Sequence, residues 1–280
     1  MKTQVSFTVN QPTLYIVSTP IGNLSDMTFR AVSILESVNL ILAEDTRVTG
    51  ILLKHYNIKT PMLSYQKFNE QERLIEIIDK LKQGESVALV SDAGTPLVND
   101  PGFLLVKSAV LANINVVSIP GASAVLAGLA SSGINPQPFT FIGFLPRKQK
   151  EASNVLKDYE NRKETLIIYE SPLRIKMTLE LILSILGNRN LSIGRELTKM
   201  FETIYRGDIN SILEHELDTR GEYVIIVEGD LTIIETSKDP VELVDYYISQ
   251  GNDEKEALKL AAKDLKVHKS EIYKLYKIKK

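Results

Sequence analysis

Short apolar runs alternate with longer amphipathic stretches through the first 120 residues of the chain. Four runs predict buried strands, at residues 14–18, 40–43, 86–91 and 115–119. Three stretches between them predict helices, at residues 27–38, 70–83 and 103–112. In the second stretch, Leu74, Ile77, Ile78 and Leu81 have the i, i+3, i+4, i+7 spacing of a helix with one apolar face. Strands that alternate with helices of this length predict βαβ units and a mostly parallel sheet.

A run of small residues, Pro120–Ser132, interrupts this pattern. A helix over Ala124–Ala130 would carry such short side chains that it could pack very closely against a neighbour. Beyond it, further strands are predicted at residues 139–144, 165–169, 192–195 and 223–227. Two helices are expected between them, one that ends near Tyr159 and one that spans residues 173–186. We therefore predict an α/β protein with two α/β domains, residues 1–121 and 122–235.

The last segment, residues 236–280, differs from both domains. Its spacing predicts three short helices, at residues 241–249, 255–265 and 271–278, with Ser270 as the cap of the last. Two helices joined by the turn 266–270 resemble a helix-turn-helix in outline. Residues 259–280 hold eight lysines and two acids, a charge of +6; subtracting this from the net −2 leaves −8 for the preceding 258 residues. This basic tail suits a partner that carries phosphates; a solvated helix bundle covering the end of the domain is the alternative.

Composition excludes several kinds of chemistry. The chain has no cysteine, so disulfides, cysteine-bound zinc, iron–sulfur clusters and thiol nucleophiles are impossible. Its three histidines, His55, His215 and His268, are too far apart to form a ligand pair, and no metal site is expected. Residues 1–12 lack the apolar stretch of a secretory signal, and no run approaches the roughly 20 residues that cross a bilayer. We therefore expect a cytoplasmic protein without a membrane segment.

Three loops rich in glycine and proline follow predicted strands, at residues 19–26, 92–102 and 120–124. In open α/β sheets, ligands bind in the crevice beyond the carboxyl ends of the strands. The loops contain neither G-x-G-x-x-G nor a P-loop, and Ser123 does not lie in a G-x-S-x-G nucleophile elbow. The three loops together therefore indicate a ligand that lacks a polyphosphate and is bound mainly by backbone amides and carbonyls.

Seven sequence blocks carry a resemblance that extends from Leu14 to about Asp230. They are S-T-P-I-G-N-L-S-D (18–26), A-E-D-T-R (43–47), S-D-A-G-T-P-L-V-N-D-P-G (91–102), P-G-A-S-A (120–124), G-F-L-P-R-K (143–148), Y-E-S-P-L-R (169–174) and G-R-E-L-T-K (194–199). In this order they resemble the tetrapyrrole-methylase superfamily, whose members use S-adenosylmethionine. Within it, the chain is most similar to the branch that methylates the ribose 2′-hydroxyl of a cytidine in small-subunit (16S) ribosomal RNA. One departure is mild: Ala122 stands where family members often have proline.

The resemblance implies that S-adenosylmethionine lies in the cleft between the two α/β domains, and that a small helical extension follows them. It implies nine residues as cofactor-binding: Pro20, Ile21, Asp92, Gly94, Thr95, Val98, Ser123, Ala124 and Tyr169. Short side chains fit this role because the backbone can then approach a ligand closely. Ser123 would also cap the helix that follows it. Members of the family are commonly homodimers.

The substrate side should recognise the phosphates and riboses of RNA, which draws on Arg and Lys. Six basic residues inside the matched blocks are candidates: Arg47, Arg147, Lys148, Arg174, Arg195 and Lys199. Each of them could instead pair with a nearby acid. The tail is a further candidate for contact with the small ribosomal subunit.

Methyl transfer to a ribose hydroxyl is helped by a base that accepts the proton. Glu170, Glu196 and Asp45 are the candidates, and the sequence does not rank them. Our hypothesis places Glu170 closest to the methyl group, because its block adjoins the expected cofactor site; water is the alternative proton acceptor. Two other functions stay open: a methylase of a tetrapyrrole or another small substrate on the same fold, and a non-catalytic rRNA-binding assembly factor.

Overall fold

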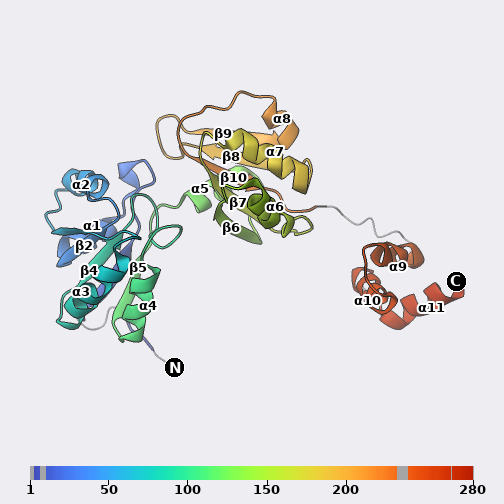
Figure 1. The fold of residues 1–280 in the computed structure, drawn as a ribbon, viewed down its shortest axis with the longest axis horizontal. Helices are drawn as coiled ribbons and strands as arrows, with labels where there is room; N and C mark the ends of the chain where they lie inside the picture. Colours follow the sequence, from blue (N-terminus) through green and yellow to red (C-terminus); the bar gives the residue numbers. More distant parts are fainter. Residues whose placement is uncertain (1–2, 7–10, 232–238, 266, 280) are drawn as a thin grey trace. The chain divides into compact units, whose positions relative to one another are not determined.

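The computed structural model describes residues 3–6, 11–231, 239–265 and 267–279. These residues fall into two compact units, Met1–Gly229 and Asp230–Lys280. The first unit contains two five-stranded sheets, and the second contains three helices (Figure 1). Among the described residues, no helix is long and apolar enough to cross a membrane.

The first sheet is entirely parallel, as the alternation of strands and helices predicts. Its strand order is β3-β2-β4-β1-β5, with every neighbouring pair parallel. The strands are β1 (Thr13–Val17), β2 (Leu40–Ala43), β3 (Met62–Ser64), β4 (Val87–Val90) and β5 (Asn115–Ile119). The helices are α1 (Phe29–Ser37), α2 (Thr46–His55), α3 (Glu70–Lys82) and α4 (Phe103–Leu111). The pattern missed β3 and α2.

Helices cover both faces of this sheet, so its strands are apolar almost throughout. On one face, α1 and α2 place Leu35 and Leu52 against Val17 and Ile41. The other face has its own apolar cluster, in which α3 and α4 contribute Ile77, Leu81 and Leu105 to the packing against Leu14 and Leu89. Burial on both faces leaves the edge at the carboxyl ends of the strands as the place where loops and ligands can gather.

The second sheet is mostly antiparallel, unlike the first. Its order is β6-β7-β10-β8-β9, in which only β6 and β7 are parallel. The strands are β6 (Phe139–Phe144), β7 (Thr165–Glu170), β8 (Asn190–Arg195), β9 (Thr203–Asp208) and β10 (Tyr223–Val227). The connection from β8 to β9, residues 196–202, is too short for the crossover of about a dozen residues that parallel neighbours require. These two strands therefore form a hairpin.

A helix of small residues packs against one face of the second sheet. The helix is α5 (Ala124–Ser132), and it shares an apolar cluster with Val224 and Ile226 of β10. A Cβ atom at Gly128 would lie 2.9 Å from Cγ1 of Val224 and 3.2 Å from Cδ1 of Ile226. The close packing expected from the composition of this segment is therefore present. The opposite face is covered by α6 (Gln149–Lys157), α7 (Ile175–Leu186) and α8 (Ile209–Leu213).

The C-terminal unit has an apolar core of its own. Its helices are α9 (Pro240–Ser249), α10 (Glu254–Asp264) and α11 (Lys269–Lys279). Each helix contributes to this core, for example through Leu243, Ala261 and Ile272. The hydroxyl of Tyr276 on α11 also donates a hydrogen bond to Oδ1 of Asp245 on α9 at 2.8 Å. The predicted cap at Ser270 is wrong, because α11 already begins at Lys269. The predicted boundary between residues 235 and 236 lies outside the described residues.

Two glycines inside helices provide a matched test of the packing of α5. Gly128→Ala should lower the free energy of unfolding by about 1–3 kcal/mol, because its Cβ overlaps Val224. Gly50→Ala on α2 should raise it by about 0.5–1 kcal/mol, since the nearest atom lies 3.7 Å away and alanine favours the helix. Urea denaturation followed by circular dichroism measures both changes. Equal effects of the same sign would contradict the packing described for α5.

Candidate active site

The three glycine- and proline-rich loops meet at one edge of the first sheet, because β1 lies between β4 and β5. The backbones of Thr19 and Gly94 form two hydrogen bonds, with N–H to O=C distances of 2.8 and 3.1 Å. The hydroxyls of Ser18 and Thr95 lie 2.9 Å apart. A Cβ atom at Gly121 would lie 2.8 Å from Cβ of Ser18, so only glycine fits there without displacement. The loops therefore form one continuous wall.

This wall lines one side of a cavity of about 580 Å³. The other side comes from the second sheet, including Tyr169 and Glu170 of β7 and Tyr223 of β10. Tyr169 packs edge-on against Phe141 and Phe144, at centroid distances of 4.8 and 5.7 Å. Seven of the nine predicted cofactor-binding residues line this cavity: Ile21, Gly94, Thr95, Val98, Ser123, Ala124 and Tyr169. Ser123 also caps α5, with its hydroxyl accepting from N–H of Leu126.

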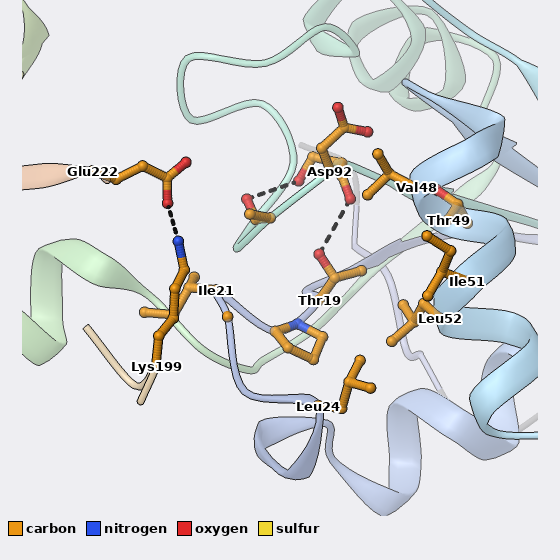
Figure 2. Close-up of a pocket in the computed structure, with 14 residues that line it drawn as sticks. Thr19, Ile21, Leu24, Val48, Thr49, Ile51, Leu52, Asp92, Lys199 and Glu222 are labelled. Carbon is orange, nitrogen blue, oxygen red and sulfur yellow. Dashed lines mark hydrogen bonds and ion pairs between the residues drawn. The ribbon is translucent and has the colours of Figure 1, made fainter. Parts of the chain in front are cut away.

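The other two predicted cofactor-binding residues, Pro20 and Asp92, line a smaller pocket of about 360 Å³. Figure 2 shows the side chains of α2 on one side of this pocket and the ion pair of Lys199 with Glu222 on the other. The pocket and the larger cavity share three lining residues: Ile21, Ala93 and Glu222. The two spaces therefore adjoin each other.

Carboxylates gather where the loops after β2 and β4 meet. Partial burial is the largest cause that raises the pKa of Glu44, Asp92 and Asp100, and repulsion between neighbouring carboxylates raises each further. Asp100 lines the larger cavity and Asp92 the smaller pocket. Among the described residues, no group of three or more acids or histidines has an arrangement that could hold a metal ion. Sequence reasoning missed Asp100, although it lies in the same loop as Asp92.

The three candidate bases lie in different surroundings. The side chain of Glu170 is fully buried; Oε1 accepts from N–H of Ser171 at 2.7 Å, and Oε2 from the hydroxyl of Thr178 at 2.6 Å. Nη2 of Arg174 lies 3.6 Å from Oε2. Glu170 lines the larger cavity, and neither Glu196 nor Asp45 is among the residues that line the two spaces.

Glu196 and Asp45 each pair with a neighbouring basic side chain. Glu196 accepts from Nζ of Lys199 at 2.8 Å, and this hydrogen bond lowers the pKa of the Glu196 carboxyl. Asp45 caps α2 and pairs with Arg47, whose hydrogen bonds lower the pKa of Asp45 to about 2. The structure therefore does not bring the three candidates together.

Comparison with known proteins places this fold in a family. The model of the tetrapyrrole (corrin/porphyrin) methylases matches residues 13–213. The chain belongs to this family. Relatives from Halalkalibacterium halodurans, 45% identical over 99% of both chains, and Bacillus subtilis, 46% identical over 95% and 94%, are both named ribosomal RNA small subunit methyltransferase I.

Solved structures show the same fold at low identity. The methyltransferase CobJ has a TM-score of 0.60 at 17% identity, covering 79% of this chain and 95% of its own. Diphthine synthase has a TM-score of 0.61 at 12% identity, covering 78% and 90%. The predicted α/β fold of the tetrapyrrole-methylase type is thus confirmed. At such identities the likeness shows the fold alone and leaves the substrate open.

The basic residues of this tetrapyrrole methylase divide into two groups. Arg174 donates to the carbonyls of Leu145 and Pro146, and Arg195 pairs with Asp218 at 2.8 Å, so both are engaged inside the protein. The exposed or pocket-lining members are Arg47, Arg147, Lys148 and Lys199. Within this second group, Arg47 pairs with Asp45, Lys148 with Glu151, and Lys199 with two carboxylates.

Residues that sequence reasoning missed come from two places, the segments on and beside the second sheet and one face of α2. Leu197, Glu222, Tyr223 and Val224 line the larger cavity, and Val48, Thr49, Ile51 and Leu52 of α2 line the smaller pocket. Leu197 lies inside a matched block, so its position in the sequence was a usable signal. Glu222 and its neighbours on β10 lie in none, and only the pairing of β10 with β7 and β8 brings them to the site.

Proposed function

We propose that this chain uses S-adenosylmethionine to methylate the ribose 2′-hydroxyl of a cytidine in small-subunit (16S) ribosomal RNA. The observation that carries the proposal is the similarity to rRNA small subunit methyltransferase I, which covers 99% of this chain. The cavity between the loops of the first sheet and the strands of the second supports it. In line with the expectation from sequence, we further propose that the enzyme acts in the cytoplasm as a homodimer.

The larger cavity fits S-adenosylmethionine in size and chemistry. Its volume of about 580 Å³ lies within the range of small-molecule sites, roughly 300–1,000 Å³. Val98, Leu126 and Val224 offer apolar surface for a nucleobase, and the backbone at Gly94 and Gly121 carries no Cβ that would block a close approach. Asp100 offers a carboxylate to a cationic ligand. Bound there, the cofactor supplies an electrophilic methyl group.

The residues around the cavity would contribute positioning before any proton moves. The hydrogen-bonded pair of Thr19 and Gly94 fixes the loops of the first sheet, and Tyr169 fixes the opposite wall by packing on Phe141 and Phe144. Holding two reactants in line can contribute about 7–11 kcal/mol to lowering a barrier. Transfer of a methyl group from the cofactor to a hydroxyl therefore requires two contributions from the protein, orientation of the reactants and a proton acceptor.

Among the three candidate bases, the geometry favours Glu170. It is the candidate that lines the cavity. All three carboxylates have a basic neighbour, but Arg174 lies 3.6 Å from Glu170, whereas Lys199 and Arg47 hydrogen-bond directly to Glu196 and Asp45. Ser171 and Thr178 hold the carboxylate of Glu170 in one orientation, and each carboxylate oxygen retains further lone-pair capacity. Glu170 would therefore accept the proton of the ribose hydroxyl as the methyl group is transferred.

On the RNA side, exposed cations would contact phosphates. Arg147 and Lys148 lie in the exposed loop after β6, and Arg47 lies in the first turn of α2 beside the smaller pocket. Lysines of the C-terminal unit would extend this contact, because Lys263 and Lys274 are exposed and have no ion-pair partner among the described residues. We infer that this unit docks on ribosomal RNA.

The decisive experiment supplies labelled S-adenosylmethionine and small ribosomal subunits that lack the modification, and then maps the methylated ribose. One labelled cytidine 2′-hydroxyl is the expected result. Label that enters only a tetrapyrrole would assign the chain to another substrate of the same fold. Absence of cofactor binding by calorimetry, together with retained RNA binding, would make it a non-catalytic assembly factor.

Glu170→Gln should lower single-turnover methyl transfer by about 10²–10⁴-fold, because an amide does not accept the proton. Thr178→Val removes the donor to Oε2 but keeps the carboxylate, so it should retain most of the rate. Circular dichroism checks that both variants are folded at the assay temperature. Unchanged turnover in Glu170→Gln would assign proton transfer to water, and equal losses in both variants would leave Glu170 with a positioning role.

Asp100 should make cofactor binding depend on pH. Burial raises its pKa, so the ionised form that attracts a cation is lost at a higher pH than for an exposed aspartate. Affinity for S-adenosylmethionine should therefore fall as pH decreases through the raised pKa. Asp100→Asn should bind about 10–100-fold more weakly and lose this dependence. Calorimetry over a pH series tests both, with Asp79→Asn, an exposed carboxylate of α3, as the matched control.

The double variant Lys263→Gln/Lys274→Gln should bind small ribosomal subunits more weakly. It should also reduce the slope of log affinity against log salt by about 1.4–1.8, because two fewer lysines displace counterions. The control Lys82→Gln/Lys107→Gln removes the same charge from exposed positions on α3 and α4. Filter binding at several salt concentrations measures both. Identical slopes in the two double variants would leave the C-terminal unit as a solvated helix bundle.

A further inference from the structure

The smaller pocket beside the larger cavity has the walls of a site for a flat, partly apolar group. Val48, Ile51 and Leu52 of α2 form one side, with Ile21 and Leu24 from the first loop (Figure 2). Ile51 is 68% exposed and Val48 is 42% exposed, although both are large apolar side chains. These exposed apolar side chains beside the pocket offer surface to a bound ligand.

Two polar groups of this pocket have unused hydrogen-bonding capacity. The hydroxyl of Thr49 is buried without a hydrogen bond partner among the described residues, although Thr49 is only 2% exposed. Asp92 accepts N–H of Asp45 through Oδ1 at 3.0 Å, and within the described part of the chain no donor reaches Oδ2. A buried hydroxyl without a partner is destabilising, and a bound ligand that pairs with it removes this cost.

The position of the pocket restricts what can occupy it. Ile21, Ala93 and Glu222 line both the pocket and the larger cavity, so a molecule that enters the pocket reaches the place where we propose the methyl donor binds. The pocket is therefore placed to hold part of the methyl acceptor. In a nucleotide whose ribose lies at these shared residues, the base is the part that extends from the ribose into the pocket.

We propose that this pocket binds the base of the target nucleotide, turned out of its stack, and that Asp92 and Thr49 recognise it as cytosine. This inference rests on the proposed rRNA methyltransferase function. Enzymes that do chemistry on a base take it out of the stack and hold it between apolar side chains while polar groups read its edge, and we infer the same arrangement for this nucleotide. Ile51 and Leu52 provide the apolar contact, and Lys199 stands opposite them beside Glu222.

The available polar groups match cytosine and not uracil. Cytosine presents its exocyclic N4 amine as a donor, which pairs with a carboxylate such as Asp92; uracil presents a carbonyl at the same position, which a carboxylate repels. The hydroxyl of Thr49 can donate to O2 or N3 of cytosine. A matched contact of this kind contributes about 1–3 kcal/mol of discrimination, a factor of roughly 10–100.

The test compares methylation of small ribosomal subunits that carry cytidine or uridine at the mapped target position. The wild-type protein should prefer cytidine by about 10–100-fold. Asp92→Asn should lower the rate of cytidine methylation by a similar factor. It should also reduce the ratio of the cytidine rate to the uridine rate, because the amide can donate to the carbonyl of uracil. Thr49→Val, which is nearly isosteric, should slow methylation of cytidine. Asp79→Asn is the matched control and should leave the preference unchanged.

Cofactor affinity separates this role from a contact with S-adenosylmethionine. Calorimetry should show the same affinity for Asp92→Asn, Thr49→Val and the wild-type protein. Ile51→Arg, at an exposed position that tolerates substitution, should raise KM for the subunit and leave cofactor binding intact.

Several outcomes would overturn the inference. A wild-type protein that methylates cytidine and uridine equally, or an Asp92→Asn variant that slows both by one factor, shows that the pocket does not read the base. A loss of cofactor affinity in Asp92→Asn with an unchanged base preference assigns Asp92 to the cofactor, as the family resemblance implies. If the wild-type protein methylates no ribosomal RNA at all, the proposed function itself fails.

Discussion

The site depends on how closely the backbone segments after β1, β4 and β5 approach one another. The paired hydrogen bonds of Thr19 with Gly94 join two of these segments, and Gly121 lies directly against Ser18 of the first. Larger side chains at Gly94 or Gly121 would separate the loops, since the backbone at Gly94 has a φ of +79° and Gly121 has no room for Cβ. The composition of the loops is therefore a consequence of packing as well as of ligand approach. The walls of both the larger cavity and the smaller pocket are built on this contact.

Loops beside the second sheet are held in place by an internal ion pair and by hydrogen bonds to backbone carbonyls. Arg195 reaches from β8 to Asp218, and Arg174 holds the backbone of Leu145 and Pro146, so the loops that carry Glu222 and Arg147 are braced from within. Arginine suits this purpose because its planar head can donate to several carbonyls at once. An arginine beside acids in a sequence block can therefore either bind a ligand or hold neighbouring loops in place. Spacing along the chain does not distinguish between them.

Much of the fold follows from the apolar pattern, and the exceptions have physical reasons. The predicted limits of β2, β5, β6 and β10 agree with the structure. β2 and β10 are uninterrupted apolar runs, and apolar residues still predominate in β5 and β6. Strand β3 has only three residues, and Met62 is exposed, so no period is visible. Helix α2 contains Gly50 and two threonines, which weaken its helical signal. The direction of strands in the second sheet depends on which strand the chain returns to, and local sequence does not encode that choice.

The candidate site was predictable where loops carry it and unpredictable where a strand or helix face does. Glycine- and proline-rich loops identified the residues around Gly94 and Ser123, whereas Glu222 and the apolar face of α2 gave no local signal. Charge adds a constraint that acts over the whole chain. The unit that carries the cavity, residues 1–229, has a net charge of −2, whereas residues 230–258 carry −6 and residues 259–280 carry +6. Within the C-terminal unit the acids precede the lysines, so a nucleic acid of negative charge is attracted by residues 259–280. Attraction of a cationic cofactor depends instead on the carboxylates that line the cavity, such as Asp100.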